Sequence, residues 1–236
     1  MAVPVSVLFT DRVGGVSEAP YDTLNLAGHV GDDPAAVQAN RDVVAGRAGV
    51  APERLVVLAA VSGGPVARVD ASSPAEVSGV EAVVTSEAGL AIGVIAADCV
   101  PVLLADDVAG VLGAAHAGRR GVEARIVTDT VQAMVDLGAE PGRIQAWLGP
   151  AICGRCYEVG DDVATQTVQV APRALATTSW GTTALDLPAA VVAELGEAGV
   201  PDIDLDPRCT AEDPLLYSYR RDGVTGRQAS VVVRRG

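Results

Sequence analysis

The chain has 236 residues, of which 49% are hydrophobic and only 3% aromatic. This length is enough for one domain with a sizeable core of Val, Ala, Leu and Ile. Its formal net charge of -13 opposes nonspecific attraction to nucleic acid or to an anionic membrane, so we expect neither as a partner. All 17 basic residues are arginines, which excludes lysine Schiff-base chemistry and a P-loop lysine.

The start of the chain and its longest apolar run bear on localisation. Residues 1–7 lack a basic leader and include Pro4, which does not suit a signal peptide. The apolar run 88–105 is interrupted by Asp98 and Pro101, so it suits buried strands better than a bilayer span. We therefore expect a cytoplasmic protein without a membrane segment.

The first half of the chain contains one helix pattern and two buried-strand patterns. Residues 34–47 have Asp32-Asp33 as a plausible cap, a proline in the first turn and apolar residues at helical spacing, which predicts a helix. The uniformly apolar run 91–96 predicts a buried strand. A turn at Asp106-Asp107 precedes a second predicted strand at 109–115.

The second half continues the alternation of helices and strands. The patterns predict helices at 121–137, 161–170 and 187–198, and strands at 142–148, 200–206 and 228–234. This order indicates an α/β fold, one domain over residues 1–236 with mixed β-sheets flanked by helices in two or three layers. The predicted helix at 121–137 begins just beyond His116, and its unpaired amides suit an anion such as phosphate.

A cysteine and a histidine stand at the ends of predicted strands. The chain has two histidines, so chemistry that needs an imidazole near neutral pH must use His29 or His116. Cys99 follows the strand at 91–96, and His116 ends the strand at 109–115. If the two strands end at one edge, thiol and imidazole can reach each other or one metal ion, as a metal pair or as nucleophile and base. Both residue types are also common as structural core residues, so that interpretation is open as well.

Five ordered motifs extend over nearly the whole chain. The central motif is Ala-Asp-Cys-Val-Pro-Val-Leu-Leu-Ala-Asp with the following Ala-Ala-His-Ala-Gly-Arg-Arg-Gly. The other motifs lie at 10–17, at 24–33 with Asn40-Arg41, at 148–152 with 156–160, and at 209–210 with 217–222. Together they resemble the YfiH-type laccase-domain family, known as polyphenol oxidases and purine nucleoside phosphorylases. The resemblance implies a YfiH-like layered sandwich.

The resemblance implies a metal site with two histidines and one cysteine, occupied by zinc or, in some accounts, copper. Cys99 and His116 match two ligand positions. The third ligand lies in a Gln-Val-His-Gly segment that aligns with residues 60–63, so Ser62 stands where the family has histidine. A serine hydroxyl is a poorer donor than an imidazole, so we expect weakened zinc binding unless water or His29 completes the site.

The resemblance also implies an enzyme that acts on a nucleoside and phosphate. It would cleave adenosine or inosine by phosphorolysis, or deaminate adenosine. In this interpretation Cys99 and His116 bind zinc, and His116 or Asp98 assists proton transfer.

Three further residues are candidate substrate contacts. The resemblance places Asn40 and Arg41 at the active site, and Arg119 stands where the family most often has Trp. Each arginine is a candidate contact to phosphate or ribose, and each also fits a solvated surface.

Alternatives to a zinc-dependent nucleoside enzyme stay open. One is a metal-free hydrolase with Cys99 as nucleophile, His116 as base and Ser62 or a backbone group as orienting partner, which would suit the editing of peptidoglycan precursors. Another is an inactive family member that binds a nucleoside or a protein. Polyphenol oxidation needs a redox metal, and one Cys with one His gives copper little support.

The remaining cysteines do not form a recognisable metal motif. Cys153 and Cys156 have the Cys-X-X-Cys spacing of redox motifs, but no thioredoxin-like pattern surrounds them. A zinc knot would also need Cys209 or His116, and no spacing favours it. We therefore expect structural thiols.

Overall fold

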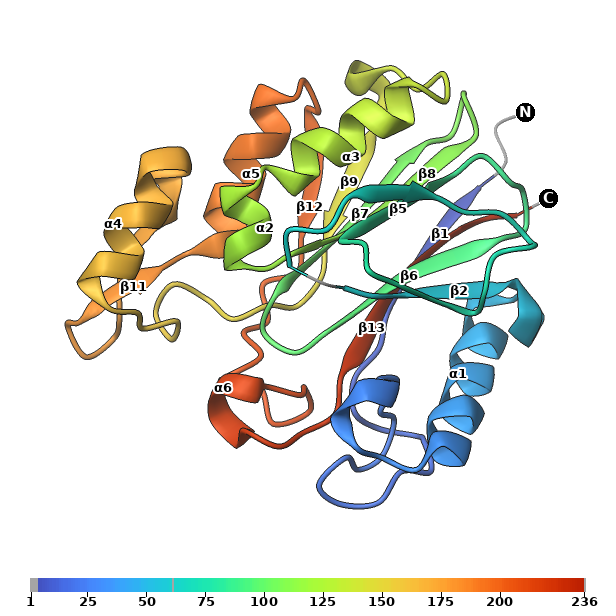
Figure 1. Ribbon diagram of the computed structural model, residues 1–236, viewed down its shortest axis with the longest axis horizontal. Helices are drawn as coiled ribbons and strands as arrows, with labels where there is room; N and C mark the ends of the chain where they lie inside the picture. Colours follow the sequence, from blue (N-terminus) through green and yellow to red (C-terminus); the bar gives the residue numbers. More distant parts are fainter. Residues whose placement is uncertain (1–3, 61, 236) are drawn as a thin grey trace.

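The computed structural model describes residues 4–60 and 62–235 (Figure 1). Two large sheets and one small one form its framework. The five-stranded sheet has, in spatial order, β1 (Val5–Phe9), β13 (Gln228–Arg234), β6 (Ala91–Ala96), β2 (Leu55–Ala59) and β4 (Glu76–Ser78). The six-stranded sheet has β12 (Asp202–Leu205), β9 (Gln145–Leu148), β7 (Val100–Asp106), β8 (Val111–Ala117), β5 (Ala82–Thr85) and β3 (Val66–Arg68).

Both large sheets contain parallel and antiparallel pairs. β2 runs parallel to β6, whereas β6 and β13 are antiparallel. In the other sheet β7 and β8 form an antiparallel hairpin that begins after Cys99 and returns to His116. The small sheet is the hairpin of β10 (Leu175–Thr177) and β11 (Thr183–Leu185).

The described residues form six α-helices beside the sheets. Two are single turns that lie near the edge where β7 begins and β8 ends. The helices are α1 (Pro34–Ala48), α2 (Arg119–Glu123), α3 (Ile126–Val135), α4 (Asp161–Val170), α5 (Leu187–Glu197) and α6 (Tyr219–Asp222), with short 3-10 turns at Gly28–Val30, Pro52–Arg54, Pro141–Arg143 and Pro172–Ala174.

Three apolar clusters hold four layers together. The central cluster lies between the two sheets and includes Ile92 of β6 and Leu103 of β7. A second cluster packs α1 onto the outer face of the five-stranded sheet, and a third packs α2, α3 and α5 onto the outer face of the six-stranded sheet. The α/β class with mixed, helix-flanked sheets is confirmed. The predicted two or three layers are wrong, because the central strands are buried on both faces and each sheet therefore needs two covers.

Most element boundaries follow the sequence patterns to within two residues. The strand predicted at 109–115 is β8 at Val111–Ala117, because Ala109 and Gly110 belong to the turn after β7. Three larger corrections are needed. The helices at 161–170 and 34–47 and the strand at 228–234 are confirmed. The predicted helix at 121–137 is two helices, because Arg125 adopts a left-handed φ of 58° and its guanidinium donates to Glu197 on α5 at 2.8 Å. The strand at 142–148 begins only at Gln145, after a 3-10 turn. The strand at 91–96 belongs to the five-stranded sheet, whereas β8, the strand that carries His116, lies between β7 and β5 in the six-stranded sheet.

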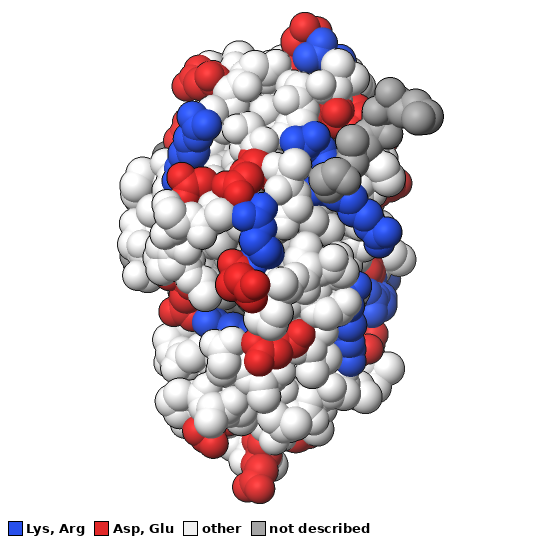
Figure 2. All heavy atoms as spheres, turned by 90° about the vertical axis from the view of Figure 1, so that its right-hand side faces the viewer, with Lys and Arg blue, Asp and Glu red and all other residues white. Residues whose placement is uncertain are grey.

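Charge is mixed over the molecular surface. Figure 2 shows arginines interspersed with acidic side chains over one face. Ion pairs such as Arg54 with Glu87 at 2.7 Å neutralise individual arginines. None of the helices in residues 4–60 and 62–235 has the length and apolar content needed to cross a bilayer.

A candidate active site around Cys99 and His116

The β7–β8 hairpin places the predicted thiol and imidazole at one edge of its sheet. Cys99 immediately precedes β7, and His116 lies opposite Pro101 in the antiparallel register. Both side chains converge beside Gly118, where a Cβ would lie 3.0 Å from Cys99 Sγ and 3.2 Å from His116 Cε1. The prediction that these two side chains approach each other is therefore met in the structure, and a small residue at 118 permits it.

A buried carboxylate supports the imidazole from behind. Glu81 precedes β5, its side chain is fully buried, and its Oε1 lies 3.4 Å from His116 Nδ1. Its backbone carbonyl also accepts the His116 backbone N–H at 3.0 Å. Because Nδ1 faces Glu81, Nε2 is the ring nitrogen left for other partners.

The surroundings favour the charged imidazole. Burial lowers the pKa of His116, but hydrogen bonds to Cys99 and Glu81, together with their charges, outweigh burial and raise the pKa to about 10. In the metal-free protein His116 is thus an imidazolium at neutral pH.

Two cavities of about 240 and 250 Å³ meet at Cys99. The first is lined by both histidines, Cys99, Tyr219 and Arg227. The second is more apolar and shares Cys99 and Tyr219 with the first; Ile152, Tyr157 and Leu187 also line it. Together they reach the size of a small-molecule site, with the thiol at their junction.

Asp98 is held in place by three hydrogen bonds. Its Oδ1 accepts the Thr210 hydroxyl at 2.6 Å, its Oδ2 accepts the Arg220 backbone N–H at 2.7 Å, and its carbonyl accepts the Ile152 N–H at 2.9 Å. Its φ of 89° lies in the left-handed region, where strain commonly marks functional sites. Asp98 lines the more apolar cavity, and its proton-transfer role stays a prediction.

The predicted substrate contacts lie outside the walls of the two cavities. Asn40 is fully buried, and its amide bonds Ser17 and backbone groups of the preceding loops. Arg41 donates to the Leu26 carbonyl and pairs with Glu76. These two residues shape the loop that carries His29, and their contact with substrate stays a prediction.

Arg119 also has a partner within the chain. It is the first residue of α2, and its Nη1 pairs with Glu123 Oε1 one turn later at 2.6 Å. The structure therefore places it in an i,i+4 surface pair near Tyr157, and its predicted contact with substrate is untested.

The third metal-ligand position has no occupant within reach. Ser62 is exposed in the turn after β2, next to Gly63, whose N–H donates to Glu81. His29 lines the same cavity as Cys99 and His116. In the described part of the chain, however, no third His, Cys, Asp or Glu brings a donor atom within 4.8 Å of both members of the pair.

The sequence patterns did not identify three residues of this site, Glu81, Tyr219 and Arg227. Glu81 precedes a short strand that was not predicted, so no pattern indicated that it is buried. Arg227 and Tyr219 lie at the cavity wall, with the Arg227 guanidinium 5.7 Å from the centre of the Tyr219 ring. Tyr219 belongs to the closing motif at 217–222, which could have signalled a site residue; Arg227 carried no separate signal.

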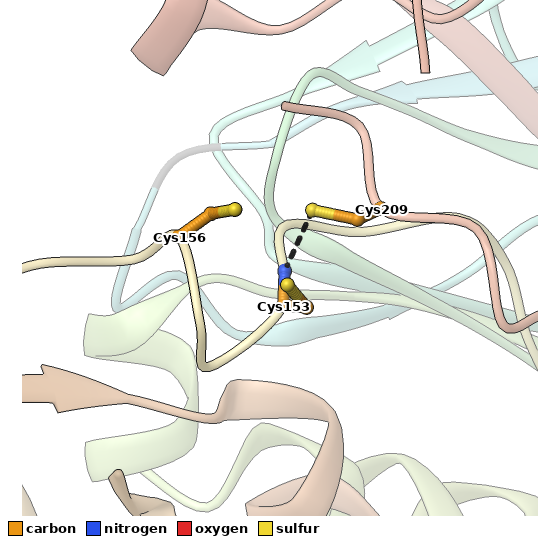
Figure 3. A group of neighbouring side chains, drawn as sticks. All are labelled: Cys153, Cys156 and Cys209. Carbon is orange, nitrogen blue, oxygen red and sulfur yellow. Dashed lines mark hydrogen bonds between the residues drawn. The ribbon is translucent and has the colours of Figure 1, made fainter. Parts of the chain in front are cut away.

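The structure also assembles a second cluster that the sequence did not predict. The donor atoms of Cys153, Cys156 and Cys209 all lie within 4.8 Å of one another (Figure 3). Three thiols at this spacing can hold a metal ion. No disulfide links them.

Comparisons with known proteins identify the family. Residues 6–235 match the family described as multi-copper polyphenol oxidoreductase laccase. A Streptomyces coelicolor protein named purine nucleoside phosphorylase is 54% identical over 95% of this chain and 93% of its own length. The purine nucleoside phosphorylase YfiH of Escherichia coli is 37% identical over 97% of this chain and 93% of its own length.

A solved structure agrees with these matches. The crystal structure of YlmD from Geobacillus stearothermophilus superposes with a TM-score of 0.91 at 35% identity, covering 98% of this chain and 92% of YlmD. The chain therefore belongs to the YfiH-type laccase-domain family.

Proposed function

We propose that this chain is a purine nucleoside-processing enzyme that cleaves adenosine or inosine with phosphate at Cys99 and His116. The observation that carries this proposal is the convergence of Cys99, His116 and Arg227 on one cavity that opens beside a second, more apolar one. The names of the relatives support the substrate class.

The two cavities suit the two halves of a nucleoside. A purine is flat and largely apolar, and the apolar cavity offers Ile152, Leu187 and the Tyr157 ring. The ribose and a phosphate are polar, and the other cavity offers the Arg227 guanidinium and the His116 imidazole. A guanidinium forms bidentate hydrogen bonds with phosphate, which makes Arg227 the proposed phosphate contact.

Cys99 and His116 also form a fitting donor pair for zinc. A thiolate and an imidazole nitrogen are preferred zinc ligands, and Glu81 behind His116 Nδ1 is the supporting carboxylate common around ligand histidines. When bound, zinc would act as a Lewis acid on a substrate oxygen. Cys99 Sγ and His116 would hold it, and water would complete its coordination.

Phosphorolysis needs an orienting charge and a proton donor from the chain. A phosphate oxygen forms a bond to C1′ of the ribose while the bond from C1′ to the base nitrogen breaks. Arg227 would hold the phosphate, and the leaving base takes up a proton. Asp98, which lines the apolar cavity proposed for the base, is the proposed residue for this proton transfer, because His116 would be bound to zinc.

The reaction class is tested by product analysis. The wild-type protein is incubated with adenosine, with and without phosphate, and adenine, inosine and hypoxanthine are separated by chromatography. We expect adenine that forms only when phosphate is present. Inosine without free base would instead show a deaminase, and the absence of any product under both conditions would refute a nucleoside enzyme.

A second candidate function follows from the Cys99, His116 and Glu81 contacts. Cys99, His116 and Glu81 would act as nucleophile, base and orienting carboxylate, which is the arrangement of cysteine hydrolases. Glu81 takes the orienting role for which the sequence suggested Ser62 or a backbone group. Such a metal-free enzyme would hydrolyse an amide, as in editing of peptidoglycan precursors. Amide hydrolysis that persists in a chelator and disappears on alkylation of Cys99 would favour it.

A further inference from the structure

The cluster of Cys153, Cys156 and Cys209 joins two loops that are far apart in sequence. The first two cysteines lie in the loop after β9, and Cys209 follows β12. An isolated parallel bridge pairs Ala151 with Cys209, and the Thr210 N–H donates to the Ala151 carbonyl at 3.1 Å. Figure 3 shows the three sulfur atoms facing a common space between these loops.

The local backbone is arranged to present sulfur atoms. The N–H groups of Cys156 and Tyr157 both donate to the Cys153 carbonyl, at 2.9 and 3.0 Å, which folds the Cys-X-X-Cys segment into a tight turn. The Cys153 N–H donates to Cys209 Sγ at 3.3 Å.

Charged side chains complete the surroundings of the cluster. Glu212 Oε1 lies 3.5 Å from Cys156 Sγ, and the Arg155 guanidinium pairs with Glu212 at 3.2 Å. Three thiolates around a divalent ion leave one negative charge beside the Arg155–Glu212 ion pair. Tetrahedral coordination leaves a fourth position, which Glu212 or a water would fill.

We propose that Cys153, Cys156 and Cys209 form a second metal site, a three-thiolate site for zinc or another thiophilic divalent ion. Zinc and thiolate sulfur are matched in softness, and the Cys-X-X-Cys turn has the spacing found in structural zinc sites. Each thiol loses its proton as the metal–sulfur bonds form, so binding releases protons. A disulfide would use two of the sulfurs and leave the third without a role.

The position of the cluster gives the ion a structural task. Ile152, next to Cys153, donates to the Asp98 carbonyl, and Thr210, next to Cys209, donates to the Asp98 carboxylate. Ile152 also lines the apolar cavity beside Cys99. An ion on the three sulfurs would hold both loops against Asp98 and so fix that wall. This inference does not depend on the proposed reaction.

The test uses a chain in which the other candidate metal site has been removed. Fully reduced, metal-free Cys99→Ala protein is titrated with Co²⁺ and, separately, with Zn²⁺ in competition with a chromophoric chelator. We expect one ion per chain, a cobalt–sulfur charge-transfer absorption, and a higher melting temperature with zinc. Adding Cys156→Ser should weaken zinc binding at least about 100-fold, since loss of even a supporting residue costs about 10–100-fold.

Two controls keep the result clear. Cys153→Ser on the Cys99→Ala background is the second ligand variant, and circular dichroism of each metal-free variant shows whether it is folded. Zinc bound equally well with and without Cys156 and Cys153 would overturn the proposal, as would cobalt bound without the charge-transfer band. A disulfide between any two of the three cysteines, found by mass spectrometry in protein alkylated on cell lysis, would also overturn it.

Discussion

Replacement of Glu81 by glutamine tests how the site controls its imidazole. Glu81→Gln keeps an oxygen for the Gly63 N–H but removes the charge 3.4 Å from His116 Nδ1. An opposite charge at this distance changes a pKa by about 1–3 units, so we expect the pKa of His116 to fall by that amount in the metal-free protein. One unit corresponds to about 1.4 kcal/mol of differential stabilisation of the imidazolium.

The chain is well suited to this measurement because it has two histidines. Their ring-proton NMR signals can be followed from pH 5 to 11, and His29→Gln assigns the pair. In the wild type His116 should titrate near the pKa of about 10 that its contacts produce. Glu87→Gln, which removes a carboxylate paired with Arg54, is the matched control and should leave the pKa of His116 unchanged. An unchanged pKa in Glu81→Gln would refute the reasoning.

Three further changes have defined outcomes. Asp106→Asn should lower the free energy of unfolding by about 1.5–3 kcal/mol, because the fully buried carboxylate pairs with Arg143. Burial raises the pKa of Asp106, but hydrogen bonds from Ala109, Glu140 and Arg143 outweigh burial and lower this pKa. The stabilisation is therefore complete above the ordinary aspartate pKa and is lost as the pH falls through the lowered value. Urea unfolding should show a larger loss of stability at pH 7 than at pH 3, and equal losses at both would contradict the prediction. Ser62→His should tighten zinc binding at Cys99 by about tenfold or more in chelator competition, and unchanged affinity would show that this turn does not reach the site. Arg227→Gln should lower kcat/KM for phosphate about 10–100-fold, because it removes a charge-assisted hydrogen bond. An unchanged value would show that Arg227 is not the phosphate contact.

The approach of Cys99 and His116 could be predicted because both stand at the ends of strongly apolar strands. The partner strand was assigned wrongly, since the runs 91–96 and 100–105 are both apolar and only the sheet pairing separates them. In strands that are buried on both faces, polar and apolar residues do not alternate, so the sequence does not indicate which face packs on which layer. The four-layer packing could therefore not be predicted.

The residues that were missed depend on tertiary contacts. Glu81 is a polar residue before a four-residue strand, and its burial results from β8 and the turn at Gly63. Cys209 meets Cys153 only because β12 pairs with β9, which places the two following loops side by side. The break at Arg125 has a similar origin, since the pattern at 121–137 is helical throughout and the contact with Glu197 comes from α5.

The most direct test of the account is adenosine phosphorolysis by zinc-loaded Cys99→Ala protein beside the wild type, at equal protein and phosphate concentrations. If Cys99 stands at the reaction centre, free adenine formation should fall at least about 1,000-fold while the melting temperature of the metal-free protein stays close to that of the wild type. A Cys99→Ala protein that releases adenine at the wild-type rate would contradict the assignment of the active site.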